Sequence, residues 1–155
     1  MQTNRRVFLK GSLAASAVGV AVGAGLLTPR AVLAEWPEAA FKAKSMDAAL
    51  SEALGASDAA DSADVTLRAP DIAENGAVVP ITVETGMGDV EEIAILVEKN
   101  EQPLVTTFNL ASASPFLSTR IRMGETSNVF GVVKSGGKLY KAHKEVKVTI
   151  GGCGG

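Results

Sequence analysis

Cysteine and histidine are almost absent, with one of each, Cys153 and His143, among 155 residues. A structural zinc site needs about four cysteine or histidine ligands, so this chain cannot supply one alone. The stretch 86–89 lacks the alternating acidic ligands of a calcium loop, and no glycine-rich phosphate loop opens a predicted helix. The sequence therefore predicts no metal and no cofactor held by this chain.

Aromatic residues are also scarce, at 5%, and no internal repeat with a period of 20 to 50 residues is visible. An apolar content of 46% with 21% charged residues is too apolar for a disordered chain and sufficient for a modest core. The length fits one domain once a leader is removed.

Residues 1–34 have the layout of an export signal: a basic start, an apolar run over 11–27 and a small-residue end at 31–34. Arg5 and Arg6, followed closely by Phe-Leu-Lys, resemble a twin-arginine (Tat) signal. The run is only weakly apolar, which disfavours the alternative of an N-terminal membrane anchor. We predict cleavage after Ala34, a periplasmic location and no membrane association of the mature chain.

Removing this leader changes the charge balance. The leader holds four of the 15 basic residues and no acidic one, so the mature chain has 11 basic against 17 acidic residues, a formal charge of −6. An acidic chain is a poor match for polyanions, which argues against nucleic acid or an anionic membrane as a partner.

The segment 35–55 is predicted to be an N-terminal helix. Apolar residues recur at helical spacings of three and four over 38–54, and Gly55 is a plausible stop. Residues 56–64 are small and acidic and are typical of a connector.

From Val65 the apolar period changes to two, which indicates strands. The predicted strands are 65–68, 79–84, 93–97, 104–110, 119–123, 129–133, 139–142 and 146–150. The run 93–97 is apolar on both faces and suits a central strand, Pro80 implies an edge or a bulge, and Gly136-Gly137 indicates a hairpin. The predicted fold class is all-β, an immunoglobulin-like antiparallel β-sandwich over 64–150.

A catalytic Cys153–His143 pair is one alternative. His143 lies between lysines, where we expect an exposed turn, and a nucleophile on a glycine tether is poorly preorganised for catalysis. Asp58, Asp61 and Asp64 are interpreted as solvated connector charges. The sequence therefore predicts no catalytic residues, although a thiol oxidoreductase that turns over alone remains a hypothesis.

The chain ends in Gly-Gly-Cys-Gly-Gly, residues 151–155, which is interpreted as a flexible carrier arm. Glycine has no Cβ and few backbone restrictions, so Gly151, Gly152, Gly154 and Gly155 make the arm slender. Three extended residues span roughly 10 Å. Cys153 can therefore stand clear of the domain and enter a narrow channel in another protein.

The thiol of Cys153 has no lysine or arginine beside it in the sequence. A free cysteine thiol is mostly protonated at neutral pH, so activation is expected from a receiving enzyme. Thiols hold and release sulfur through S–S bonds. The main alternative is an exported scaffold or adhesion module dimerised through a Cys153 disulfide. The prenylation pattern fails because the cysteine is third from the end.

A Tat-type leader, a small β-sandwich and a terminal Gly-Gly-Cys-Gly-Gly resemble the SoxY family of bacterial thiosulfate oxidation. The resemblance covers essentially the whole chain and implies that Cys153 carries the sulfur covalently. It implies a heterodimer with a leaderless SoxZ-like subunit, loading by a SoxAX-like haem protein, and removal of sulfate by a SoxB-like hydrolase. A sulfur dehydrogenase is a further candidate partner. In this family the metals and haems belong to those partners.

Two apolar stretches are candidates for burial against such a partner, the run 93–97 and the alternating residues of 146–150. The basic residues that could frame a polar rim around that interface are Arg120, Arg122, Lys144 and Lys147.

Overall fold

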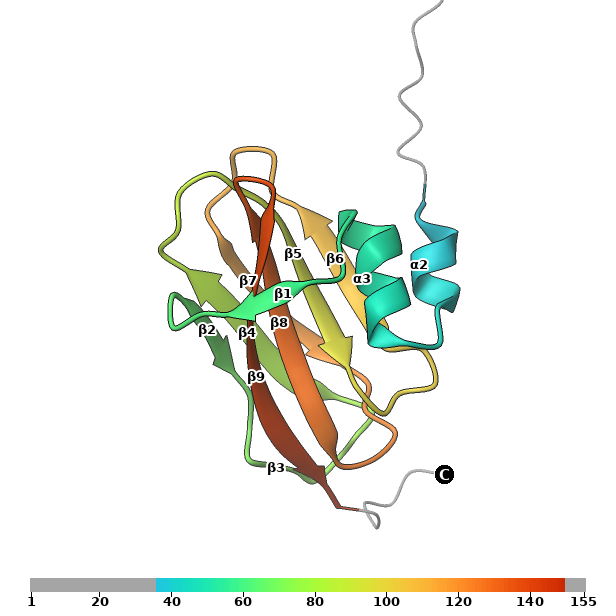
Figure 1. Ribbon diagram of the computed structural model, residues 1–155. Coiled ribbons are helices and arrows are strands. Elements are labelled where there is room, and N and C mark those ends of the chain that lie inside the picture. Colours follow the sequence, from blue (N-terminus) through green and yellow to red (C-terminus); the bar gives the residue numbers. More distant parts are fainter. Residues whose placement is uncertain (1–35, 150–155) are drawn as a thin grey trace, which may run out of the picture. The chain divides into compact units, whose positions relative to one another are not determined.

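A computed structural model describes residues 36–149. Within this range the chain forms two short helices followed by nine strands (Figure 1). The helices are α2 (Glu38–Lys42) and α3 (Met46–Leu54). The strands are β1 (Ala59–Asp61), β2 (Val65–Arg68), β3 (Ile72–Ala73), β4 (Val79–Thr85), β5 (Val90–Val97), β6 (Leu104–Asn109), β7 (Phe116–Ile121), β8 (Ser127–Ser135) and β9 (Lys138–Val148).

The strands form two sheets, which confirms the predicted β-sandwich. The larger sheet has six strands in the order β1-β9-β8-β5-β6, with β3 also paired to β9, and the smaller has the order β2-β4-β7. All pairs are antiparallel except β1 and β3, which both run parallel to the edge of β9 that faces away from β8. The segment from β1 to β3 thus leaves the larger sheet, adds β2 to the smaller one and returns.

The predicted helix over 38–54 is divided in two. Ala43 is extended (φ −59°, ψ 141°), and the hydroxyl of Ser45 accepts a hydrogen bond from the amide of Ala48, which caps the start of α3. The apolar spacing continues through this break because both helices turn small residues to the same sheet. Gly55 ends α3 in the left-handed conformation (φ 79°), as predicted.

Strand β5 is central, as its sequence predicts. Ile93, Ile95 and Val97 face the smaller sheet, whereas Ala94 and Leu96 face the helices. All of residues 93–97 are fully buried within the chain's own fold. They are therefore not available to a partner protein, and the expectation that this run meets one is wrong.

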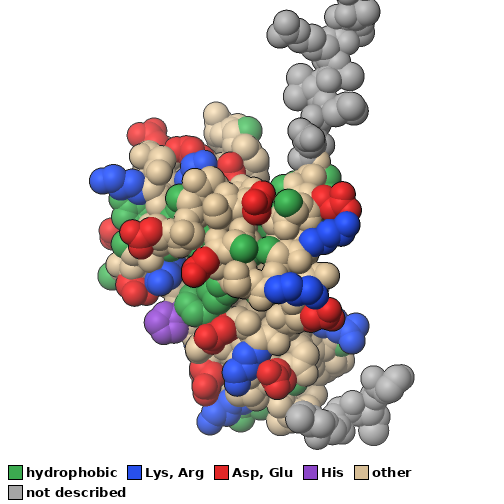
Figure 2. Space-filling model, turned by 45° about the vertical axis from the view of Figure 1, so that its right-hand side comes forward, with side chains coloured by type: hydrophobic (Ala, Val, Ile, Leu, Met, Phe, Trp, Pro, Cys, Tyr) green, Lys and Arg blue, Asp and Glu red, His purple; other side chains and the backbone are tan. Residues whose placement is uncertain are grey.

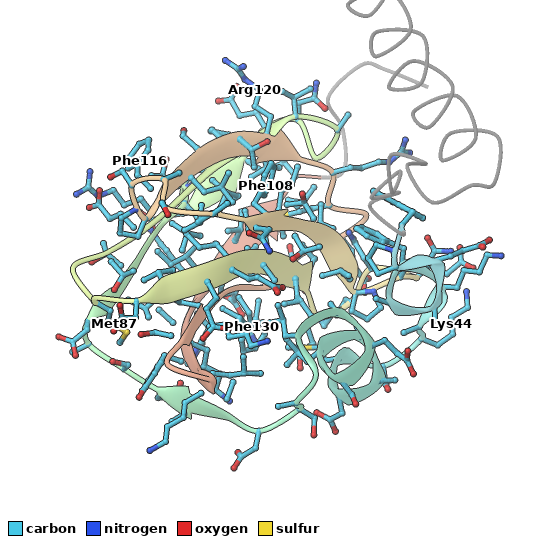
Figure 3. All side chains as sticks on the ribbon, turned by 90° about the horizontal axis from the view of Figure 1, so that it is seen from above. Lys44, Met87, Phe108, Phe116, Arg120 and Phe130 are labelled. Atoms are coloured by element: carbon cyan, nitrogen blue, oxygen red, sulfur yellow. The ribbon has the colours of Figure 1, made fainter. Side chains whose placement is uncertain are left out.

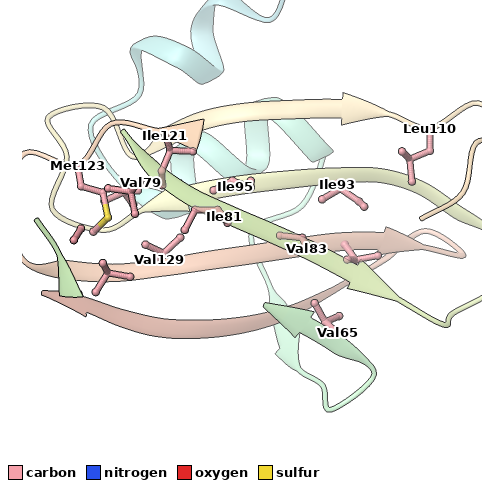
Figure 4. Close-up of a cluster of buried hydrophobic side chains, with 14 residues drawn as sticks. Val65, Val79, Ile81, Val83, Ile93, Ile95, Leu110, Ile121, Met123 and Val129 are labelled. Atoms are coloured by element: carbon pink, nitrogen blue, oxygen red, sulfur yellow. The ribbon is translucent and has the colours of Figure 1, made fainter. Parts of the chain in front are cut away.

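The main core lies between the two sheets (Figure 4). It is built from inward-facing residues of both sheets, because alternate side chains of a strand point to opposite faces. Its fully buried members include Val79, Ile81, Val83, Ile93, Ile95 and Val129. A second cluster, which includes Leu50, Leu54, Leu96 and Val132, joins the helices to the outer face of the larger sheet.

Pro80 lies where β4 is an edge strand, as predicted. It is paired with Arg120 of β7, but β2 ends at Arg68, opposite Thr82, and does not reach Pro80. The β8–β9 hairpin also follows the prediction. Gly136 and Gly137 both have positive φ, 55° and 73°, as the favoured two-residue turn requires.

Strand β9 differs from its prediction, because it runs unbroken through His143 where a turn was expected between two strands. Residues 143 to 145 are polar yet keep the strand pairing with β8. The predicted connector over 56–64 also contains a short strand, β1, which pairs with residues 139–141 of β9.

Candidate functional site

The predicted carrier residues Cys153, Gly151, Gly152, Gly154 and Gly155 lie outside the described residues. The structure describes the strand that leads to them. β9 ends at Val148, and Thr149 is the last described residue (Figure 1). The geometry of this strand end decides how firmly the following segment is attached to the domain.

On one side, the end of β9 is bonded to the segment 71–74. The amide of Lys147 donates to the carbonyl oxygen of Asp71 at 3.0 Å, and the amide of Thr149 donates to that of Ala73 at 3.1 Å. The hydroxyl of Thr149 lies 3.4 Å from the carbonyl oxygens of both Ala73 and Glu74. Backbone and side chain together hold Thr149 against β3.

On the other side, a side-chain hydrogen bond continues the contacts of β9 beyond its last backbone pair with β8. The last β8–β9 pair joins Ser127 to Val146. Beyond it, the hydroxyl oxygen of Thr126 accepts a hydrogen bond from the amide of Val148 at 3.0 Å. The two sides together satisfy the backbone donors from Lys147 to Thr149, so the strand is held to its last described residue.

A close backbone contact supports the same end. Gly76 accepts a hydrogen bond from the amide of Met123 at 2.7 Å. A Cβ at position 76 would meet the carbonyl oxygen of Met123 at 2.5 Å and the Cγ1 of Val148 at 2.9 Å. Only glycine fits there, so the turn before β4 packs tightly beside β9.

Lys144 anchors the segment that precedes β3. Its Nζ lies 2.9 Å from a carboxylate oxygen of Asp71 and donates to the carbonyl oxygen of Ala69 at 2.7 Å. This hydrogen bond, together with the charge of Lys144, lowers the pKa of Asp71 below its ordinary value of 3.8. Lys144, predicted for an intermolecular rim, is therefore already engaged within the domain.

His143 lies in β9 and not on a turn. Its ring stacks on Phe130 of β8 with centroids 5.4 Å apart, and its Nδ1 lies 3.8 Å from a carboxylate oxygen of Asp61. The side chain is 54% exposed. These contacts describe a surface histidine on the sheet, and its position relative to Cys153 lies outside the described residues.

A separate hollow of about 630 Å³ opens between the start of β5 and the loop after β6. Asp89, Ala111 and Ser112, the non-glycine residues with positive φ in the described range, all line it. Of the three carboxylates in its lining, that of Glu91 accepts a hydrogen bond from the amide of Gly137 and lies 3.7 Å from the ammonium of Lys134. The described lining of the hollow contains three carboxylates and no cysteine or histidine.

Charged side chains of both signs are interspersed over the face shown in Figure 2. Among residues 36–149, no three acidic, cysteine or histidine side chains gather as ligands for one metal ion. None of the helices in that same range is long and apolar enough to cross a membrane.

These features define a class of protein, a small two-sheet β-sandwich with a pair of helices packed on one sheet. Its strand β9 is firmly bonded to its neighbours and precedes the sequence segment that contains the sole cysteine. A family model, the sulfur oxidation protein SoxY, matches residues 50–153. The chain belongs to the SoxY family.

One solved structure supports this assignment. The sulfur carrier protein SoxY from Chlorobium limicola f thiosulfatophilum is 41% identical, with a TM-score of 0.62, over 74% of this chain and 100% of that chain. An engineered protein matches at 16% identity and a TM-score of 0.40, over 57% of this chain and 21% of that chain. No curated protein matches.

Sequence reasoning missed the residues that hold the strand end. Thr126 lies just before the predicted strand 129–133, and nothing in the local pattern marks its hydroxyl as an acceptor for β9. The parallel pairing of β3 with β9 joins residues 75 positions apart, from Ile72 to Lys147 and from Ala73 to Val148, a contact that only the fold creates.

Proposed function

We propose that this chain carries thiosulfate-derived sulfur covalently on Cys153 and presents it to periplasmic sulfur-oxidising enzymes. The observation that carries the proposal is the family match, whose range of residues 50–153 ends on the sole cysteine. The 41% identity to a protein described as a sulfur carrier supports the same role.

The chemistry of the strand end and of the following segment suits a carrier. A firmly bonded strand end gives the arm a defined origin at Thr149. Gly151 and Gly152 then supply freedom and a small cross-section. The thiol is mostly protonated when free in water, so positive charge or a metal in the receiving enzyme must activate it. The carrier thus delivers the group and leaves the catalysis to its partners.

Each proposed step balances. In loading, the Cys153 sulfur bonds to the sulfane sulfur of thiosulfate, the S–H proton goes to water, and two electrons pass to a SoxAX-like haem protein. In the next step, a SoxB-like hydrolase adds water to the terminal sulfone sulfur. The bond between the sulfone and sulfane sulfurs breaks, sulfate leaves, and the sulfane sulfur stays on Cys153 as a persulfide. A sulfur dehydrogenase then oxidises the persulfide sulfur to a sulfonate, with oxygen from water and with the electrons passed to its own electron acceptor, or the sulfur passes to another sulfur acceptor.

The proposed partners explain the export route. A Tat signal over residues 1–34 would carry the chain already folded, together with a leaderless SoxZ-like subunit as a heterodimer. The periplasm is where the loading and hydrolysing enzymes would then meet the arm.

Intact mass spectrometry of the carrier from thiosulfate-grown cells tests the proposal. Wild-type protein should carry thiol-linked sulfur adducts, and Cys153→Ser should lack them and fail to support thiosulfate oxidation. Circular dichroism should give the same fold for both proteins. A Ser variant with full thiosulfate oxidation would overturn the proposal.

A further inference from the structure

We infer that the enzyme that loads Cys153 docks on the rim around the end of β9, with Ile72 and Val78 as apolar contacts. Here the β9 rim means Ile72, Glu74, Val78, Glu125 and Lys147. The inference rests on the proposed function, because it concerns where that function's partners bind.

The length of chain beyond Thr149 sets the geometry. Four residues, 150–153, separate the last described residue from the thiol-bearing one. Fully extended, they span roughly 13–14 Å at about 3.3–3.6 Å per residue. A partner whose reactive group is recessed must therefore bring the mouth of its site close to Thr149. The rim around Thr149 is then in contact whenever the thiol is delivered.

Ile72 lies beside this exit. It is paired with Lys147 in the parallel β3–β9 ladder, and the next residue, Ala73, accepts the hydrogen bonds of Thr149. The Ile72 side chain is 57% exposed, whereas Ala73 is buried in the core. The exposed Ile72 side chain, on the strand bonded to the end of β9, gives a partner apolar surface to contact.

Val78 lies on the other segment that contacts the end of β9. It closes the turn in which Gly76 packs against Met123 and Val148, and its amide donates to the carbonyl oxygen of Asn75. Val78 is 50% exposed, although Val79 beside it is fully buried. Ile72 belongs to a segment bonded to β9 through its backbone, and Val78 follows a turn that packs against the Val148 side chain, so a partner can meet both without rearranging the domain.

The β9 rim has two acidic residues, Glu74 and Glu125, and one basic residue, Lys147, so its charge is net negative. Glu74 and Glu125 are exposed, and among the described residues neither carboxylate is in an ion pair. Both residues lie beside the groups that hold β9: the backbone carbonyl oxygen of Glu74 accepts from the hydroxyl of Thr149, and Glu125 precedes Thr126. A partner mouth with apolar contacts and flanking lysine or arginine would complement them. The same positive charge would favour the thiolate of Cys153.

Steady-state loading kinetics test the inference on the intact carrier complex, with the haem-containing loading enzyme, thiosulfate and an electron acceptor. The test variant is Ile72→Ser with Val78→Ser. The matched control is Phe116→Ser, because Phe116 is 53% exposed and pairs with Glu84 at the far end of β4 from Val79. The side chain of Phe116 is labelled in Figure 3. The rate of Cys153 alkylation by iodoacetamide measures the reactivity of the thiol, and the midpoint of thermal unfolding measures the stability of the fold.

The double variant should raise the KM for the carrier about tenfold with little change in kcat, a loss of about 1.4 kcal/mol of binding free energy. Alkylation and thermal midpoint should match wild type, and Phe116→Ser should load normally. An unchanged KM in the double variant, or an equal rise of KM in Phe116→Ser, would overturn this inference and leave the proposed function standing. Wild-type carrier that takes up no sulfur would overturn the proposed function, and this inference with it.

Discussion

Thr149 donates two hydrogen bonds to a single acceptor, the carbonyl oxygen of Ala73, through its amide at 3.1 Å and its hydroxyl at 3.4 Å. This places the last described residue of the chain under the same restraint as a residue within a sheet. A carrier arm is useful only if its free part begins at a defined point, because freedom in the strand itself would dilute the thiol over a larger volume.

Thr126→Val should loosen the end of β9. The change removes the oxygen that accepts from the Val148 amide while keeping nearly the same shape. Losing one hydrogen bond costs about 1 kcal/mol, so amide exchange at Val148 should speed up about fivefold. Native-state hydrogen exchange by NMR measures this, and Thr126→Ser, which keeps the hydroxyl, should behave like wild type. Equal exchange in the Val and Ser variants would contradict the assigned role of Thr126.

Gly131→Ala should destabilise the sandwich core. A Cβ at position 131 would lie 2.9 Å from the Cγ2 of Val83 and 3.4 Å from the Cδ1 of Leu67, both across the space between the sheets. Overpacking of this kind costs about 1–3 kcal/mol in the free energy of unfolding. Urea denaturation measures the loss.

Two further variants control that experiment. Gly88→Ala should be nearly neutral, because a Cβ there meets nothing within 4 Å. Adding Val83→Ala to Gly131→Ala makes room for the new methyl group, so the two changes should cost less together than the sum of each alone. Additive costs would mean that Val83 is not the obstacle.

Asp71→Asn should reveal a pH-dependent contribution from the contact with Lys144. The pKa of Asp71 is lowered below 3.8, first by the hydrogen bond from Lys144 and then by its charge. A depressed carboxyl pKa stabilises the fold above the unfolded-state value, and this stabilisation is lost as the pH falls through the folded-state value. The wild type should therefore exceed the Asn variant in stability at neutral pH. The difference should begin to shrink as the pH falls to 3.8 and should vanish only below the lowered folded-state pKa of Asp71.

Urea denaturation midpoints of wild type and Asp71→Asn, measured from neutral pH to below pH 3.8, test this prediction. Asp58→Asn, at an exposed carboxylate, is the matched control. A gap between wild type and Asp71→Asn that stays constant with pH would assign the effect to the shape of the side chain and not to its charge.

The strands could be predicted where alternation and turn residues coincide. β2 spans 65–68 as expected, and the Gly136-Gly137 turn fixes the hairpin because both residues need positive φ. β1 could not be predicted, since Ala59, Ala60 and Asp61 have little intrinsic strand preference and pair only because the edge of β9 is there.

The helix break shows a different limit. Apolar spacing continues from α2 to α3, so the pattern predicts one helix, and only the Ser45 cap reveals the interruption. In the candidate site, the sole cysteine and its flanking glycines could be predicted as functional from the sequence. The anchoring by Thr126, Ala73 and Gly76 depends on contacts between segments distant in sequence, which no local pattern encodes.

Replacing Gly151 and Gly152 with valine should slow loading of the carrier without altering its thiol. Two β-branched side chains stiffen the backbone and widen the arm, so the thiol should reach a recessed site less often and in poorer geometry. Loading by the haem-containing enzyme should fall about tenfold or more. Alkylation of Cys153 by iodoacetamide, which needs no channel, should stay the same.

Gly86→Val is the control for that loss of loading, because a Cβ at position 86 meets nothing within 4 Å and the residue lies in the turn after β4. The double valine variant separates the carrier from the alternative of a scaffold dimerised through Cys153. A disulfide between two chains needs an exposed thiol but no narrow arm, so a scaffold would keep its function with valine at both positions. Retained loading and retained thiosulfate oxidation in that variant would therefore rule out delivery through a narrow channel.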